Sequence, residues 1–149
     1  MVPAPASYWL TPAADRDDLP AAECLRLWLG SGLWGFYRRN RTRSRIRHGD
    51  WLAFYASRRG VVAYARAAGS ADALLGADQW PEPTTPRPDV YSIAITSVTW
   101  LRKPVPIPTV THRLESFRGK TPQAVKNWAW LVNSTRRVSA ADFLVLTGR

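Results

Sequence analysis

The sequence has 149 residues, which suffices for one domain with a hydrophobic core and is too short for two ordinary domains. Hydrophobic residues make up 46% of it, so we expect a folded globule rather than a disordered chain. The formal net charge is +10, from 21 Lys and Arg against 11 acidic residues, and this excess indicates a polyanionic partner.

The N-terminal third is predicted to contain a strand, a helix and a basic loop. Residues 7–11, SYWLT, form a short aromatic strand that ends at Pro12. Residues 19–30, LPAAECLRLWLG, form a helix with Pro20 near its first turn and a glycine as its stop. The next stretch, LWGFYRRNRTRSRIRHGD at residues 33–50, has no apolar stripe, and we expect it to be irregular.

The middle of the chain is predicted to be mostly strand. Residues 51–57 and 61–69 read as two strands joined by a tight turn, which together form a hairpin. Residues 70–88 are rich in Ala and Pro and form a long excursion, with one helical turn around residues 73–75. Polar and apolar residues alternate over residues 89–101, which predicts one long strand.

The last third is predicted to contain a connector and two helices. Three prolines keep residues 103–110, KPVPIPTV, out of a sheet interior. Residues 121–133 form a helix with Thr121 as N-cap and Pro122 at its first position. A last short helix opens at Ser139 with a pattern like a capping box. This order of elements lacks the alternation of a parallel α/β fold, so we expect an α+β fold with a partly closed barrel.

Composition also limits the compartment and the cofactors. Cys24 is the only cysteine, so an internal disulfide is excluded, and two histidines leave little material for a zinc site. The start, MVPAPASYWL, lacks a basic region followed by a long apolar run, and no stretch of 18 apolar residues occurs. We therefore expect a cytoplasmic protein that binds no metal, no cofactor and no membrane.

No residues have the spacing of a known catalytic or nucleotide-binding motif. The candidate general bases are His48 and His112, and neither has a nucleophile with supporting spacing beside it. Asp15, Asp17 and Asp18 share one predicted loop and are expected to be charges at the start of the helix. A Walker sequence and a GxGxxG motif are both missing. These observations favour a binding module over an enzyme.

The strongest functional signal is a run of arginines that directly follows the aromatic residues Trp34, Phe36 and Tyr37. In an extended conformation the alternate arginines of this run would point to one side, which suits a chain of phosphates. Aromatic rings beside arginines are typical of single-stranded nucleic-acid recognition, where stacking contributes about 1–3 kcal/mol per base. The alternative is a solvated loop that keeps the protein soluble. The arginines of the run are Arg38, Arg39, Arg41, Arg43, Arg45 and Arg47.

Seven segments, in their order and spacing, resemble the EVE domain of the PUA-like superfamily, which is related to the YTH and ASCH domains. These segments are SYWLT, LWGFYRR, IRHGDWLAFYAS, GVVAYARAAG, DVYSIAITSVTWL, NWAWL and RRVSAADFLVL. The resemblance spans residues 7–146 and implies that residues 1–149 form a single EVE/PUA-like domain. The implied fold is a pseudobarrel of about five to six mostly antiparallel strands with flanking helices.

The resemblance further implies a pocket for a flipped, modified base such as 5-methylcytosine, 5-hydroxymethylcytosine or N6-methyladenine. Bacterial members are associated with modification-dependent restriction or RNA metabolism, so DNA or RNA and a partner nuclease are implied. Trp34 is the leading pocket candidate because we expect it in a loop beside the charges. Arg136 matches an arginine before the last helix and joins the phosphate-binding set. The base-pocket residues implied position by position are Trp9, Thr11, Trp34, Gly35, Tyr37 and Tyr55.

One departure leaves the preferred base open, because Thr11-Pro12 stands where many members have Lys-Ser. The favoured function is a reader that holds the flipped base in the aromatic pocket while the arginine-rich loop grips the phosphate backbone. One alternative is an enzyme acting on a nucleic acid or nucleotide in the same pocket, with His48 as base. Others are an RNA-binding module without modification specificity and a protein that uses its basic face on acidic partners.

Overall fold

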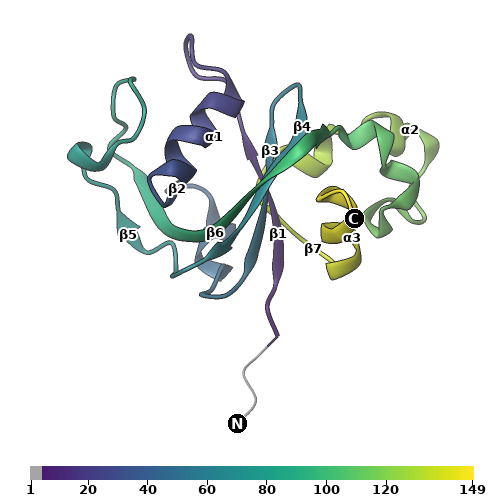
Figure 1. Cartoon of the computed structure of the whole chain (residues 1–149). Coiled ribbons are helices and arrows are strands. Elements are labelled where there is room, and N and C mark those ends of the chain that lie inside the picture. The colour runs from purple at the N-terminus through teal and green to yellow at the C-terminus, as the bar shows by residue number, and fades with distance from the viewer. Residues whose placement is uncertain (1–4) are drawn as a thin grey trace.

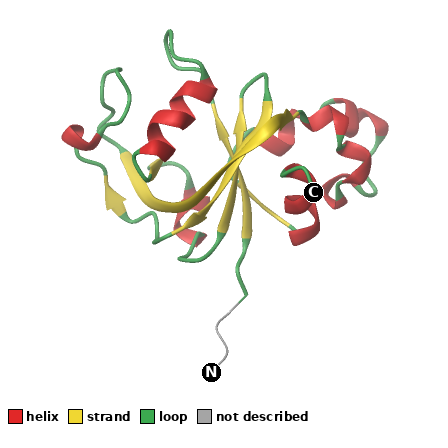
Figure 2. Cartoon of the chain, in the orientation of Figure 1, coloured by secondary structure: helices red, strands yellow, loops and turns green. Residues whose placement is uncertain are grey.

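The computed structural model describes residues 5–149; the first four residues of the expected domain lie outside this range. A curled sheet runs through the middle, with α1 on one side and α2 and α3 on the other (Figures 1 and 2). The helices are α1 (Ala21–Gly30), α2 (Pro122–Lys126) and α3 (Ala140–Leu146). The strands are β1 (Tyr8–Ala13), β2 (Leu33–Tyr37), β3 (Trp51–Ala56), β4 (Gly60–Ala67), β5 (Ala73–Leu74), β6 (Val90–Val105) and β7 (Arg136–Val138).

The order of strands leaves the barrel open. The sheet runs β2-β6-β4-β3-β1-β7, with β5 added to β6. Every pair is antiparallel except β1 and β3, which run parallel. The expected α+β pseudobarrel is therefore confirmed. Because β2 and β7 stand at opposite ends of this order and do not pair, a seam remains between β2 and the β1–β7 side.

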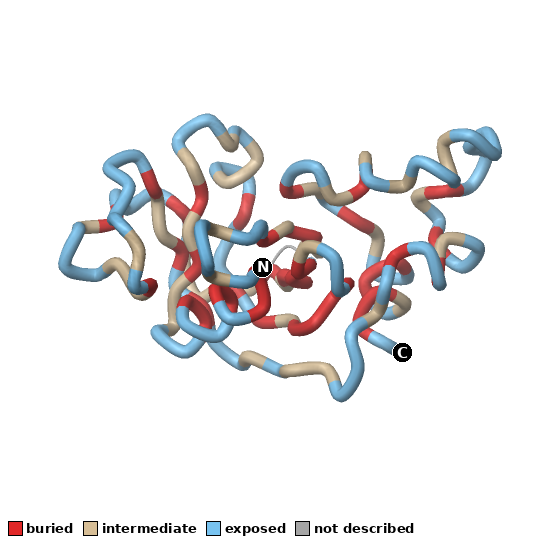
Figure 3. The backbone as a smooth tube through the Cα atoms, turned by 90° about the horizontal axis from the view of Figure 1, so that it is seen from above, coloured by how far each residue is buried: buried red, intermediate tan, exposed pale blue. Residues whose placement is uncertain are grey.

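Buried side chains form two clusters, one on each side of the sheet. The first packs Leu25 and Trp28 of α1 against the strands, and the second packs Leu10 of β1 against Phe143 of α3. Buried positions concentrate along the central strands, and exposed positions lie in the outer loops (Figure 3). Because successive residues of a strand face opposite sides, Trp9 belongs to the first cluster while Leu10 belongs to the second.

The helix before residue 30, the hairpin, the long strand and the last helix are confirmed. The first strand does not end at Pro12, as predicted, but continues to Ala13. The N–H of Trp51 donates to the carbonyl oxygen of Ser7, and the N–H of Ser57 donates to the carbonyl oxygen of Ala13. The main-chain N–H and C=O groups of odd-numbered residues in β1 therefore point toward β3. The nitrogen of Pro12 therefore faces the side of β7, where pairing has already stopped.

Three loop predictions are wrong. Residues 33–37 form strand β2 rather than an irregular stretch, since Trp34 and Phe36 alternate inward against their more exposed neighbours. Residues 103–105 belong to β6, because Pro104 falls where the pairing of β6 with β4 is irregular and needs no N–H donor. The helical turn expected around residues 73–75 lies at Ala77–Gln79, and residues 73–74 form β5.

The helix predicted over residues 121–133 begins correctly but is shorter. The side chain of Thr121 accepts from the Ala124 N–H at 3.2 Å, and α2 then ends after Lys126. A 3-10 helix, Trp128–Val132, takes its place. The other 3-10 helices are Arg41–Arg45, Ala77–Gln79, Ile107–Thr109, Thr111–Arg113 and Glu115–Phe117.

Candidate nucleic-acid interface

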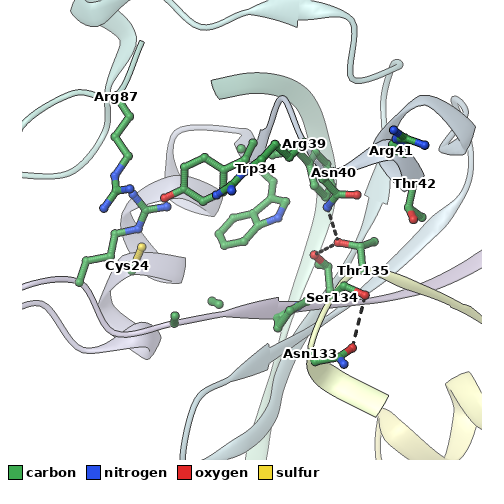
Figure 4. Close-up of a pocket in the computed structure, with 18 of the residues that line it drawn as sticks. Cys24, Trp34, Arg39, Asn40, Arg41, Thr42, Arg87, Asn133, Ser134 and Thr135 are labelled. Atoms are coloured by element: carbon green, nitrogen blue, oxygen red, sulfur yellow. Dashed lines mark hydrogen bonds between the residues drawn. The ribbon is translucent and has the colours of Figure 1, made fainter. Parts of the chain in front are cut away.

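A cavity of about 720 Å³ opens at the seam between β2 and the β1–β7 side of the sheet. Its volume lies within the roughly 300–1,000 Å³ that is usual for small-molecule sites. The seam creates the cavity because the free edges of β2 and of the end of β1 cannot close on one another. The lining consists of residues 11–16, 34–37, 39–42 and 133–135, with Cys24 and Arg87 (Figure 4).

Trp34 lies in β2 and forms part of the cavity wall. Only 6% of its surface is exposed, and its ring packs edge-on against Trp28 at 6.0 Å and Phe54 at 5.3 Å. The expectation that Trp34 sits in a loop is wrong, and burial leaves no open face on which a base could stack. Its buried Nε1 has no hydrogen-bond partner in residues 5–149. A buried donor left unpaired costs about 1–3 kcal/mol, so this N–H would gain from any acceptor that came within hydrogen-bond distance.

Three polar side chains meet across the seam. The Oγ1 atoms of Thr11 and Thr135 lie 2.9 Å apart in a hydrogen bond, and both residues are buried. Asn40 donates through Nδ2 to the same oxygen of Thr135 at 3.1 Å (Figure 4). These bonds tie β1, the arginine-rich segment and the approach to β7 together at the cavity wall.

Two guanidinium groups lie near the Tyr37 ring, which lines the cavity. Arg16 lies 5.6 Å from the ring centroid and Arg87 lies 5.4 Å from it, and they come from two loops far apart in the sequence. Such cation–π contacts contribute about 0.5–1 kcal/mol each at exposed sites. Arg39 and Arg41 also line the cavity, whereas Asp15 is its one carboxylate, so the lining is strongly positive.

Cys24 lines the cavity, and its side chain is a neutral thiol. It donates to Oε2 of Glu82 at 2.8 Å, and Trp28 donates to the same oxygen at 2.6 Å. Burial, together with the hydrogen bond and charge of Glu82, raises the pKa of Cys24 to about 12. A thiol of that pKa is protonated at neutral pH and is not an activated nucleophile.

Glu82 anchors the excursion of residues 70–88 to α1. It is buried and accepts hydrogen bonds from Cys24, Trp28 and Thr84, and Arg16 lies 3.7 Å away. Burial raises the pKa of the Glu82 carboxyl, but these hydrogen bonds and Arg16 outweigh it, so the pKa lies below its usual value. The carboxylate therefore holds in place the chain that carries Arg87.

Four of the six base-pocket residues implied by the resemblance line the cavity: Thr11, Trp34, Gly35 and Tyr37. Gly35 is glycine for a packing reason, since a Cβ there would lie 2.8 Å from Cη2 of Trp28. It therefore meets the cavity through its backbone.

Two residues of that set lie elsewhere. Trp9 is 2% exposed and donates through Nε1 to Oδ2 of Asp50 at 2.9 Å, so it belongs to the core. Tyr55 packs edge-on against Trp128 at 6.3 Å in the second cluster, and burial raises its pKa. The structure does not bring either residue to the cavity.

The arginine run does not form the extended, one-sided array that its alternation suggested. Arg41–Arg45 is a 3-10 helix, whose three residues per turn spread alternate side chains around its axis. Arg43 donates to the Ala71 carbonyl oxygen at 2.7 Å and stacks on Tyr91 at 3.7 Å, so it acts in packing. Arg45 is exposed.

The remaining members of the predicted phosphate-binding set lie outside the cavity. Arg38 is exposed, and Arg47 lines a second concavity described below. Arg136 donates to the Trp130 carbonyl oxygen at 3.1 Å and stacks on the Trp130 ring at 5.5 Å. Arg136 is therefore held by packing, whereas Arg38 and Arg47 expose their charge.

The structure separates the histidines from the cavity. His48 lies in the second concavity and His112 is exposed in a 3-10 helix, so neither can serve as a base beside Trp34. Within residues 5–149, no group of three His, Cys, Asp or Glu side chains could hold a metal ion. No helix in the same range combines the length and apolar character needed to cross a bilayer.

Sequence reasoning missed several lining residues. Arg16 and Arg87 are 71 positions apart in the chain and both lie near the Tyr37 ring, and Asn40 and Thr135 meet across the seam. Glu82, which does not line the cavity but contacts its lining residues Arg16 and Cys24, lies in an excursion with no periodic signal. Only the folded arrangement shows that these side chains share one site.

No protein-family model and no curated protein matches the chain. Its fold recurs in solved structures. Human THYN1 in complex with 5-methylcytosine-containing DNA is 13% identical, with a TM-score of 0.58 over 97% of this chain and 99% of that one. A protein from Agrobacterium tumefaciens is 17% identical, with a TM-score of 0.56 over 95% and 91% of the two chains. A hypothetical protein from Leishmania major is 16% identical, with a TM-score of 0.55 over 95% and 92%.

Proposed function

We propose that this chain is a nucleic-acid-binding reader that accommodates a flipped, modified base in the cavity at the seam. The observation that carries the proposal is the unpaired, buried Nε1 of Trp34 in the wall of a cavity lined by four arginines. The fold shared with THYN1, whose structure contains 5-methylcytosine DNA, supports it. Assignment to the EVE domain family and a partner nuclease belong to the same proposal and rest on the resemblance, whereas the cytoplasmic location in it rests on the cysteine content of the sequence.

The cavity wall offers both polar and apolar contacts to a base. The N–H of Trp34 donates to a ring nitrogen or carbonyl oxygen at the base edge, and the hydroxyl groups of Thr11 and Thr135 lie across the seam. Pro12, Ala13 and Ala14 add an apolar part to the lining. A methyl group buried there gains about 0.8 kcal/mol, which corresponds to roughly fourfold in affinity.

The charges at the mouth act on the sugar-phosphate chain. Arg39, Arg41 and Arg87 can each neutralise a phosphate, whereas Arg16 is already paired with Glu82, and such phosphate contacts weaken as salt rises. Extracting a base from a duplex costs a few kcal/mol, whereas a single strand avoids most of that cost. The protein is therefore expected to bind a single-stranded or mismatched target more tightly than a paired one.

The enzymatic alternative loses the base that it named, since His48 lies elsewhere, and Cys24 is a neutral thiol rather than an activated nucleophile. An RNA- or DNA-binding module without modification specificity would use the same arginines. The two binding functions differ in whether a modified base raises affinity.

The test is a binding array read by fluorescence anisotropy. Short single- and double-stranded DNA and RNA oligonucleotides are compared, unmodified or carrying one 5-methylcytosine, 5-hydroxymethylcytosine or N6-methyladenine, at two salt concentrations. We expect one modified base to raise affinity at both salt concentrations, and total affinity to fall with salt. Equal affinity for modified and unmodified strands would identify a module without modification specificity. Absence of binding at low salt would overturn the proposal.

A further inference from the structure

A second basic concavity, of about 930 Å³, lies at the end of the sheet where β1 and β3 begin and β4 ends. Its charged lining comes from separate parts of the chain. Arg47 and His48 precede β3, Arg66 belongs to β4, and Arg137 belongs to β7. We call this concavity the Arg47–Arg137 groove.

The carboxylate of Asp50, which lines this groove, already accepts three hydrogen bonds from within the protein. Asp50 is 5% exposed and accepts from the main-chain N–H groups of Ser7 and Arg47 and from Nε1 of Trp9, each at 2.9 Å. Within residues 5–149, no ion pair joins Asp50 to an arginine of the groove. The guanidinium charges of the groove are therefore not neutralised by a partner in that part of the chain.

The groove contains one arginine in a fixed position. Arg66 donates through Nε to the Gly49 carbonyl oxygen at 3.1 Å and lies 5.0 Å from the Trp51 ring centroid. These contacts hold the guanidinium in one orientation, which lowers the entropy lost when it binds an anion. Arg47 and Arg137 are exposed and complete the positive lining.

Three segments connect the groove to the Trp34 cavity. One segment runs from Ser7 in the groove, just before β1, to Thr11 in the cavity, and a second segment runs from Thr135 in the cavity to Arg137 in the groove. The arginine run spans the same interval from Arg41 to Arg47. Four residues of a β-strand cover about 13 Å, which is about four times the 3.4 Å rise of a stacked nucleotide, and an unstacked strand spans it with fewer nucleotides.

We infer that the Arg47–Arg137 groove binds the phosphate backbone of the same nucleic-acid strand, a few nucleotides away from the base held in the Trp34 cavity. This inference rests on the proposed function. The exposed Arg45 lies between Arg41 of the cavity and Arg47 of the groove in the sequence, and it would contact the nucleic-acid strand between the two sites. The protein would thus recognise one base and several phosphates beside it.

The test compares two probes on the full chain carrying both Arg47→Ala and Arg137→Ala. The first probe is 5-methyl-deoxycytidine monophosphate, which is too short to reach the cavity and the groove at once. The second is a single-stranded DNA of about 12 nucleotides with one central 5-methylcytosine, a length within the usual footprint of single-strand binders. The charge-matched control carries Arg102→Ala and Arg118→Ala, two exposed arginines that line neither the cavity nor the groove.

We expect the groove variant to lose affinity for the 12-nucleotide strand and to keep its affinity for the mononucleotide. Each phosphate contact adds about 0.7 to the salt slope of single-strand binding, so the slope should fall by about 1.4 and the affinity at 0.15 M salt by about tenfold. The affinity of the control variant for each probe should lie within twofold of the affinity of the original protein.

Two results would overturn the inference separately from the proposed function. If the groove variant and the control bind the longer strand with equal affinity and equal salt slope, the groove does not contact the strand. If the groove variant loses affinity for both probes equally, the two arginines act on the cavity instead. If the original protein binds neither probe and no strand of the binding array, the proposed function fails and the inference fails with it. A thermal melt of each variant confirms that it is folded.

Discussion

The side-chain oxygens of Thr11 and Thr135 lie 2.9 Å apart, in a hydrogen bond between residues 124 positions apart in the chain. It joins the end of β1 to the segment that leads into β7, next to the unpaired edge of β2. Asn40 donates to the same Thr135 oxygen at 3.1 Å, so one hydroxyl connects three segments of the cavity wall. The shape of the cavity depends on this contact because β2 and β7, at opposite ends of the strand order, do not pair across the seam.

Replacing Thr135 by Val keeps the side-chain shape and removes that hydroxyl. Thr11 and Asn40 then lose their common partner, and we expect the free energy of unfolding to fall by about 1–3 kcal/mol. Urea denaturation measures the change. Thr99→Val, at an exposed position of β6, is the matched control and should stay within about 0.5 kcal/mol of the parent. Equal stability of the two variants would show that the seam does not depend on Thr135.

Trp34→Phe tests the buried N–H without emptying the core. A Trp34→Ala change would remove a buried ring and cost about 3–5 kcal/mol, so lost binding could reflect unfolding. Phe keeps an aromatic ring between Trp28 and Phe54 and removes only the donor and part of the ring. We expect affinity for a strand with the preferred modified base to fall about tenfold, the value of one hydrogen bond near 1.4 kcal/mol.

The control for this prediction is Trp100→Phe, at a half-buried tryptophan that lines neither the cavity nor the groove. Fluorescence anisotropy titrations of both variants, after a thermal melt confirms folding, give the comparison. If Trp34→Phe binds the modified strand as tightly as Trp100→Phe, the indole N–H does not contact the base.

The elements that could be predicted from the sequence are those whose signal is local. Helix α1 shows its buried face as an apolar period, and the β3–β4 hairpin shows two apolar runs around a tight turn. The N-caps Thr121 and Ser139 were recognisable because a cap bonds within its own first turn. Strand β2 was missed because five residues with a central glycine carry little periodic signal.

The candidate site could be predicted only in part, because its contacts join segments distant in the chain. The Trp-Gly element and Tyr37 were found through the resemblance, and they do line the cavity. The acceptor of Arg43 is the carbonyl oxygen of Ala71, a partner that spacing within the arginine run cannot indicate. For the same reason the sequence predicts one role for all arginines of the run, whereas in the folded protein Arg43 packs against other residues and Arg45 is exposed.

Arg43 and Arg45 should therefore respond differently to the same substitution. Arg43→Ala loses the bond to Ala71 and the stacking on Tyr91, so we expect the free energy of unfolding to fall by about 1–3 kcal/mol. Arg45→Ala should leave stability within about 0.5 kcal/mol, since Arg45 is exposed. In the proposed function it should also reduce the salt slope of strand binding by about 0.7.

Urea denaturation and anisotropy titrations at several salt concentrations separate the two effects. Equal loss of stability in both variants would contradict the structural role assigned to Arg43. An unchanged salt slope in Arg45→Ala would remove Arg45 from the path of the strand.

Glu82 makes the stability of the α1 side depend on pH. Its pKa lies below the usual 4.5 in the folded protein, because the hydrogen bonds from Cys24, Trp28 and Thr84 and the charge of Arg16 outweigh burial. The unfolded chain therefore binds this proton more readily, so the stabilisation is complete above about pH 4.5 and disappears as the pH falls through the lower folded pKa. We expect Glu82→Gln to lower the free energy of unfolding at neutral pH by about 1–3 kcal/mol. In acid the free energies of unfolding of the two proteins should lie closer together. Urea denaturation of both proteins at neutral pH and at about pH 3 measures this, and a difference that stays constant with pH would show that the Glu82 carboxylate charge is not what holds the excursion to α1.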